Sequence, residues 1–214
     1  MADLSTLYPR LQTEALGAPP ALMDLKIRDA ARMFMREAPA WQVTHADITV
    51  VIQTDEYALT PPADAEVVRV LRVNYLGPTA TKARPLKPVA ESMLHPGWET
   101  VERGLEAFMS TKYNTLTLVP RPDVNTTGTL ENVVMQLRPT RSAATIDDDV
   151  LNRWEEEIMV GAQWLLYDMQ DQPWTNKAEA RRYKLRFTKS WADARRELEK
   201  GFSQANLRVK IPAL

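Results

Sequence analysis

The last third of the sequence contains two stretches in which apolar residues recur every three or four positions. In the first stretch they are Leu151, Trp154, Ile158, Ala162, Leu165 and Met169, and in the second Tyr183, Phe187, Trp191, Ala194 and Leu198. This spacing places each set on one face of an α-helix. Asp147 is a candidate N-cap for the first helix, and Pro173 cannot continue a helix, so residues 170–174 are predicted to separate the two. Each helix therefore has an apolar face that must be covered.

A third amphipathic helix is predicted near the N-terminus, over residues 20–38. Pro19 and Pro20 favour its start, and Pro39 favours its end. Its apolar face consists of Met23, Ile27, Ala30, Phe34 and Ala38. Residues 1–19 are expected to be irregular, with at most a short helical turn that covers a neighbouring surface.

Between these helices the apolar residues alternate with polar ones, which is typical of β-strands. Strands are predicted over residues 48–52, 67–75 and 133–137, and a hairpin over residues 108–111 and 116–119. Residues 57–59 are expected to pair back onto the first strand, and residues 88–94 to form a short helix. On the strand from Val67 to Tyr75, the odd-numbered residues are expected on one face and the even-numbered residues on the other.

The resulting fold class is α+β. The simplest architecture is a helical bundle of the N-terminal helix and the C-terminal helix pair, with an inserted antiparallel β unit beside it and an extended C-terminal arm. We expect one domain over residues 1–214, with a helical part over 20–38 and 147–203, a β part over 47–142 and the arm over 204–214.

Composition and motifs give no indication of an enzyme. There is no cysteine, the formal net charge is −1, and the histidines His45 and His95 stand in separate predicted loops without a nucleophile signature. No phosphate-binding or zinc-protease motif is present. The acidic runs 147–149 and 155–157 are better explained as a helix N-terminus and a solvated face than as a metal site. We therefore expect no catalytic residues, metal or cofactor, and no apolar run is long enough to cross a membrane.

The second helix of the C-terminal pair is basic on its predicted outer surface. This surface is either a solvated helix face with internal ion pairs or a face that meets an acidic partner or DNA phosphates. The residues concerned are Arg181, Arg182, Lys184, Lys189, Arg195 and Arg196.

The C-terminal arm has the alternation of a strand. Leu207, Val209 and Ile211 alternate with Arg208 and Lys210, ahead of Pro212 and the final Leu214. A strand that leaves its own domain adds readily to the edge of another sheet. The alternative is a frayed or internally packed tail.

The order of these features resembles the head–tail adaptor proteins of tailed double-stranded DNA bacteriophages, also called connector or gatekeeper proteins, which include tail tubular protein A of short-tailed phages. The resemblance extends over nearly the whole chain. It is carried by an ordered set of short segments, which are 7–9, 28–34, 57–59, 67–70, 96–98, 116–120, 137–140, 161–162 and 173–174, and by the single residues Trp41, Trp154, Ile158 and Phe187.

The resemblance implies a structural virion protein without enzymatic activity. Members of the family assemble as a ring, usually of twelve copies, beneath the portal, where they extend the DNA channel and provide a platform for tail or nozzle proteins. The expected partners are therefore the portal protein, tail proteins, further copies of the chain and the passing double-stranded DNA. The expected location is the neck of the virion, and the host cytoplasm during assembly.

On this interpretation the arm residues Leu207, Arg208, Val209, Lys210, Ile211 and Leu214 bind the portal, and the basic helix faces the portal or the DNA channel. Two alternatives remain open. One is a tail-completion or terminator protein of the virion. The other is a small cytosolic protein, either an enzyme or a nucleic-acid-binding module, against which the absent motifs and the near-zero net charge count.

Overall fold

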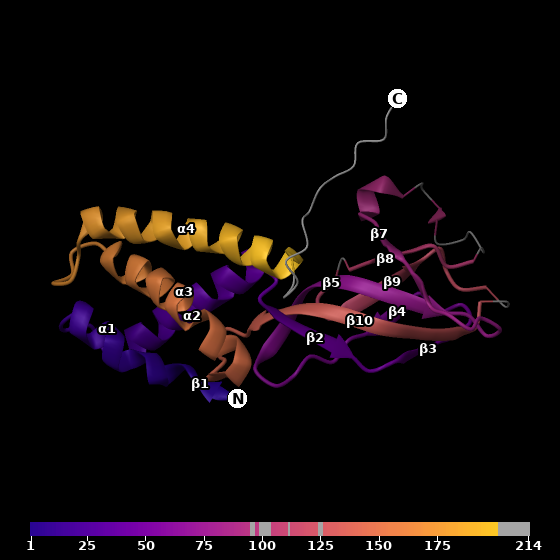
Figure 1. The fold of residues 1–214 in the computed structure, drawn as a ribbon, viewed down its shortest axis with the longest axis horizontal. Helices are drawn as coiled ribbons and strands as arrows, with labels where there is room; N and C mark the ends of the chain where they lie inside the picture. Colours follow the sequence, from indigo (N-terminus) through magenta and orange to yellow (C-terminus); the bar gives the residue numbers. More distant parts are fainter. Residues whose placement is uncertain (95–96, 99–103, 111, 124–125, 201–214) are drawn as a thin grey trace, which may run out of the picture. The chain divides into compact units, whose positions relative to one another are not determined.

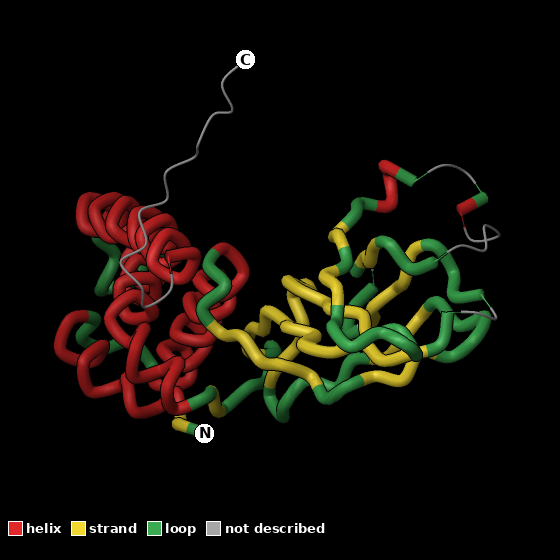
Figure 2. Tube along the Cα trace, turned by 45° about the vertical axis from the view of Figure 1, so that its right-hand side comes forward, coloured by secondary structure: helices red, strands yellow, loops and turns green. Residues whose placement is uncertain are grey.

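The structure, a computed structural model, describes residues 1–94, 97–98, 104–110, 112–123 and 126–200 (Figure 1). The chain divides into two compact units. One comprises Met1–Ala40 together with the chain from Ala144 onward, and the other is Trp41–Ala143. The first unit is mainly helical and the second consists mainly of strands and loops, as the colours of Figure 2 show. The α+β prediction is confirmed.

The helical unit is built from three long helices and a short N-terminal segment. Its elements are β1 (Ala2–Asp3), the 3-10 turn η1 (Leu4–Leu7), α1 (Tyr8–Glu14), α2 (Pro20–Glu37), β11 (Thr145–Ile146), α3 (Asp148–Tyr167) and α4 (Lys177–Lys200). Helix α2 follows the prediction closely, and all five residues of its expected apolar face are buried.

Aromatic side chains from the three long helices meet in the core of this unit. The Phe34 ring of α2 lies 5.4 Å from the Trp154 ring of α3 and 6.2 Å from the Phe187 ring of α4, measured between centroids. Trp191 meets Phe187 edge-on at 5.4 Å. Aromatic pairs at these separations contribute beyond their buried area, so this cluster links the N-terminal helix to the C-terminal pair.

Gly161 is the point where α3 approaches both other helices. A Cβ atom built there would lie 2.7 Å from two ring atoms of Phe187 and 2.9 Å from the Cβ of Ala30. Real Cβ atoms do not approach so closely, so a side chain at this position would force the helices apart. Glycine is therefore needed here for close packing.

The sequence predicts the features of α3 only in part. Asp147 caps the helix as predicted, accepting hydrogen bonds from the backbone N–H groups of Asp149 and Val150. The expectation of a single apolar face is wrong, because every residue from Ile158 to Gln163 is buried. Helix α2 packs on one side of α3 and α4 on another (Figure 1), so most of the circumference of α3 is covered. Leu166 is fully buried where Leu165 was expected.

The first nineteen residues are more regular than the sequence indicates. Leu4, Leu7 and Leu11 are buried, and α1 begins beside Pro9, a residue favoured in the first turn of a helix. Strand β1 pairs with β11, and the terminal amino group lies 2.8 Å from Asp148. These leucines lie only three and four positions apart over barely two turns, so the amphipathic signal was too short to identify a helix.

The second unit contains two sheets and the 3-10 turn η2. The first sheet consists of β2 (Trp41–His45), β3 (Ile48–Val50), β5 (Ala65–Leu76), β6 (Arg84–Pro85) and β10 (Gly128–Pro139). The second consists of β4 (Glu56–Ala58), β7 (Lys87–Pro88), β8 (Ala107–Met109) and β9 (Thr115–Val119), and the 3-10 turn is η2 (Glu91–Met93). Strand β10 is central in the first sheet, because β5 pairs along one side while β2 and β3 share the other.

Several local predictions for this unit are wrong. Residues 57–59 were expected to pair with the first strand, but β4 pairs with β9 in the other sheet. The hydroxyl of Tyr57 in β4 instead binds the backbone of Val51 and Thr54. The expected helix over residues 88–94 is the end of β7 followed by η2. The unit is also not purely antiparallel, because β7 runs parallel to β8. The hairpin of β8 and β9 is confirmed.

Strand β5 does not keep the expected alternation. Val67, Val73 and Tyr75 are buried as predicted, but Val70 is buried and Arg69 is exposed. The pairing register between β5 and β10 shifts at several points, and Asn132 in β10 has a positive φ of 50°. A β-bulge places one extra residue in a strand and reverses the faces of the residues beyond it. Two of these shifts place the extra residue in β5 itself, because the consecutive residues Val134 and Met135 pair with Arg72 and Val70, and Gln136 and Leu137 pair with Arg69 and Val67. The apolar pattern of β5 does not show where its partner strand shifts register.

Candidate protein-interaction surfaces

The six predicted basic residues of α4 are all exposed, but most of them contact the helical unit itself. Arg182 pairs with Glu179 at 3.4 Å, Arg196 pairs with Asp193, and Arg195 donates a hydrogen bond to the backbone oxygen of Glu37. These contacts correspond to the solvated helix with internal ion pairs that was one of the two interpretations. The ammonium group of Lys184 lies over the Trp164 ring, 5.3 Å from its centroid.

Arg181 and Lys189 are different, because neither has an ion pair within the described residues. Leu185 lies between them along the helix and is 73% exposed. The three residues are spaced four apart, so they form one strip along the helix surface. We call Arg181, Leu185 and Lys189 the outer stripe of α4. Leu185 was not singled out from the sequence, although its position outside the apolar series was visible.

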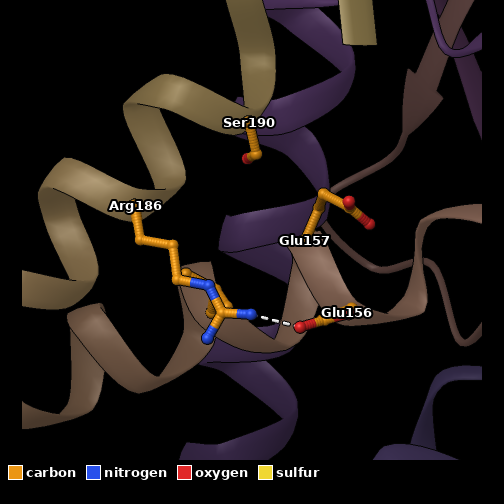
Figure 3. A pocket seen from close by; sticks show the side chains of 5 residues that line it. Glu156, Glu157, Arg186 and Ser190 are labelled. Carbon is orange, nitrogen blue, oxygen red and sulfur yellow. Dashed lines mark hydrogen bonds and ion pairs between the residues drawn. The ribbon is translucent and has the colours of Figure 1, made fainter. Parts of the chain in front are cut away.

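A pocket of about 160 Å³ opens between α3 and α4 (Figure 3). It is lined by Glu156, Glu157 and Val160 of α3 and by Arg186 and Ser190 of α4. The guanidinium group of Arg186 points at Glu156, with which it forms an ion pair, and the carboxylate of Glu157 is turned away from it (Figure 3). We call this the Glu157 pocket.

Three glutamates contribute negative charge around this pocket, and two of them form an ion pair with an arginine. Glu156 pairs with Arg186, and Glu197 pairs with Arg153 at 2.6 Å. Glu157 has no ion pair in the described part of the chain, and its carboxylate accepts a hydrogen bond from its own backbone N–H. The pKa of Glu157 is raised, mainly by burial and also by the charges of Glu156 and Glu197. The hydrogen bond from its own N–H and the charge of Arg186 act in the opposite direction and lower it. Glu157 is therefore a half-buried carboxylate that forms no ion pair among the described residues.

Replacing Glu157 with glutamine should stabilise the helical unit at neutral pH. The folded-state pKa of Glu157 is raised, so protonation favours the folded state, and this advantage is lost as the pH rises through that pKa. Glu157→Gln should therefore raise the free energy of unfolding above the pKa by up to about 1 kcal/mol, since solvent screens a half-buried group. The gain should disappear in acid, where Glu157 is protonated in both states.

Urea denaturation at pH 4 and pH 7.5 measures this difference. The matched control is Glu156→Gln, which removes the neighbouring carboxylate and breaks its pair with Arg186, and which should give no stabilisation. Equal stability of Glu157→Gln and the wild-type protein at both pH values would show that Glu157 is adequately solvated.

The other candidate residues from the sequence are the two histidines and the residues of the C-terminal arm. His45 accepts a hydrogen bond at Nε2 from the Thr60 N–H, at 3.2 Å, and its Nδ1 lies 2.7 Å from the oxygen of Ala46. His95 and the arm residues Leu207, Arg208, Val209, Lys210, Ile211 and Leu214 lie outside the described residues.

Among the residues that are described, no group of three or more acidic or histidine side chains is arranged to hold a metal ion. None of the described helices is long and apolar enough to cross a membrane.

The comparison with protein families decides the assignment. A family described as "SU10 adaptor protein" matches residues 2–209, which is nearly the whole chain. The chain belongs to the SU10 adaptor family. No curated protein matches the sequence. Membership identifies the chain as a phage adaptor, a structural class of protein.

Proposed function

We propose that this SU10 adaptor is the head–tail adaptor of a tailed phage, located in the virion neck between the portal and the tail. The family match over residues 2–209 is the observation that supports this most directly. In this role the protein binds beneath the portal, extends the DNA channel and provides the attachment platform for tail or nozzle proteins, as tail tubular protein A does in short-tailed phages. The protein would be made in the host cytoplasm and then incorporated into the particle.

The proposed assembly is a closed ring of twelve copies. Each subunit would be one adaptor domain over residues 1–214, in which the long helices form a bundle, the β part is inserted and the arm over residues 204–214 reaches the portal. A closed ring needs head-to-tail contacts between two different surfaces of each subunit. Some of the basic residues of α4, of which Arg181 and Lys189 have no ion pair among the described residues, would face the portal or the DNA.

We propose no catalytic role. His45, the only described histidine, is bound to the backbone through both ring nitrogens, which leaves no free base at that position. Hydrolysis of DNA or nucleotides by the purified protein, abolished in His45→Ala or His95→Ala, would contradict this proposal.

The ring is tested by counting chains in neck particles. Native mass spectrometry of necks assembled from the portal protein of the same phage and this chain should give equal numbers of portal and adaptor subunits. The free protein is expected to be monomeric or weakly associated, because a weak contact between subunits gains from attachment to a common template. Three or six adaptor copies per portal dodecamer would contradict the proposed ring. Copurification with the tail alone would favour a tail-completion or terminator protein.

A further inference from the structure

Charged side chains of both signs that form no ion pair among the described residues lie on two different surfaces of the helical unit. Glu157 lines the pocket and forms no ion pair among the described residues, while its neighbours Glu156 and Glu197 are both paired. Arg181 and Lys189 are exposed cations that have no ion pair among the described residues. The Glu157 carboxylate of one copy is therefore complementary in charge to Arg181 and Lys189 of another copy.

These two surfaces lie on different sides of α4. Arg186 and Ser190 of the pocket are each one position further along the helix than Leu185 and Lys189 of the outer stripe. One position corresponds to about 100° around an α-helix. A single copy therefore cannot place its own outer stripe against its own pocket, and the contact must be made by another chain.

We propose that the Glu157 pocket of one copy receives the outer stripe of α4 from a neighbouring copy. In this contact the amine of Lys189 or the guanidinium of Arg181 lies against the Glu157 carboxylate. Leu185 loses its contact with water against the rim of the pocket, which adds an apolar contribution. The proposal rests on the ring described above and identifies the two surfaces that its subunits use.

The chemistry of the pocket favours a cationic side chain as the occupant. A half-buried carboxylate without a partner has lost part of its hydration and has received no ion pair in return. A lysine or arginine from outside compensates that loss, which an apolar or acidic group does not. The contact is heterologous, since the pocket and the outer stripe are different surfaces, and this is the type of contact from which closed rings are built.

Charge reversal on each surface tests the contact. The first variant is Glu157→Lys, which places a cation in the pocket. The second is Arg181→Glu combined with Lys189→Glu, which makes the outer stripe acidic. Each variant alone opposes like charges at every subunit boundary, so we expect occupancy of purified portals to fall by about tenfold or more.

A mixture of the two variants should restore assembly. In an alternating ring, the basic pocket of one variant meets the acidic stripe of the other, and the native pocket of the second meets the native stripe of the first. A 1:1 mixture should therefore occupy portals nearly as well as the wild-type protein, with equal numbers of the two variants by native mass spectrometry. Glu106→Lys, a charge reversal at an exposed residue of the β unit that has no ion pair among the described residues, should leave occupancy unchanged.

Three further results separate the possible failures. If wild-type rings form and Glu157→Lys rings form equally well, the proposed contact is wrong while the adaptor function stands. If both variants are defective and the mixture is not rescued although each variant keeps its circular-dichroism spectrum, the two surfaces do not meet, and the contact is again wrong. If the wild-type protein forms no ring on portals, the contact and the proposed function both fail.

Discussion

Trp154→Ala is expected to lower the free energy of unfolding of the helical unit by about 3–5 kcal/mol. Trp154 is 4% exposed, and its ring packs on Phe34 of α2 with a centroid separation of 5.4 Å. Truncation to alanine removes this contact and leaves a cavity between the N-terminal helix and α3, which the close contacts at Gly161 would prevent from collapsing. A loss of this size is a large part of the stability of an ordinary domain.

Urea denaturation followed by far-ultraviolet circular dichroism measures the effect. The control is Tyr113→Ala, which removes an aromatic side chain that is 76% exposed and should change stability by less than about 0.5 kcal/mol. If Trp154→Ala unfolds at the same urea concentration as the wild-type protein, the aromatic cluster does not hold the three helices together.

Truncation after Ser203 is expected to abolish binding to portal rings and to leave the fold intact. Every buried apolar residue of the described chain lies at or before Ala194, so the shortened protein should keep its circular-dichroism spectrum and its melting temperature. The arm is proposed to bind as an added strand, which derives affinity from backbone hydrogen bonds and selectivity from alternate side chains. Twelve arms on one ring would act together, so their loss should have a large effect even if each is weak.

Two full-length variants show which side of the arm makes the contact. Replacing Leu207, Val209 and Ile211 with serine removes one side, and replacing Arg208 and Lys210 with alanine removes the other. If the apolar side docks on the portal, the first variant should bind as poorly as the truncated protein and the second should retain binding. Binding of the truncated protein at wild-type strength would show that the portal contact lies on the helices.

The sequence alone determined where the long helices lie and which residues of α2 and α4 face inward. It could do so because periodicity, proline and a capping aspartate are local signals, and they act on the same residues in the folded chain. Pro20 at the start of α2, Asp147 at the N-cap of α3 and the buried Phe187 of α4 all follow from neighbours within a few positions. The adaptor resemblance, which the family match supports, likewise depends on an ordered series of such local segments.

Only the tertiary structure decided how these elements combine. Three features depend on residues far away in the chain. Strand β4 pairs with β9, β5 loses its alternation where its register with β10 shifts, and α3 is covered over most of its circumference. The Glu157 pocket is the clearest example. In the sequence, residues 155–157 form one acidic run. In the structure Glu155 pairs with Arg10 and Glu156 with Arg186, while Glu157 forms no ion pair among the described residues. Which carboxylate finds a partner depends on the helices that pack on each side of α3, because an ion pair forms between side chains that are close in space.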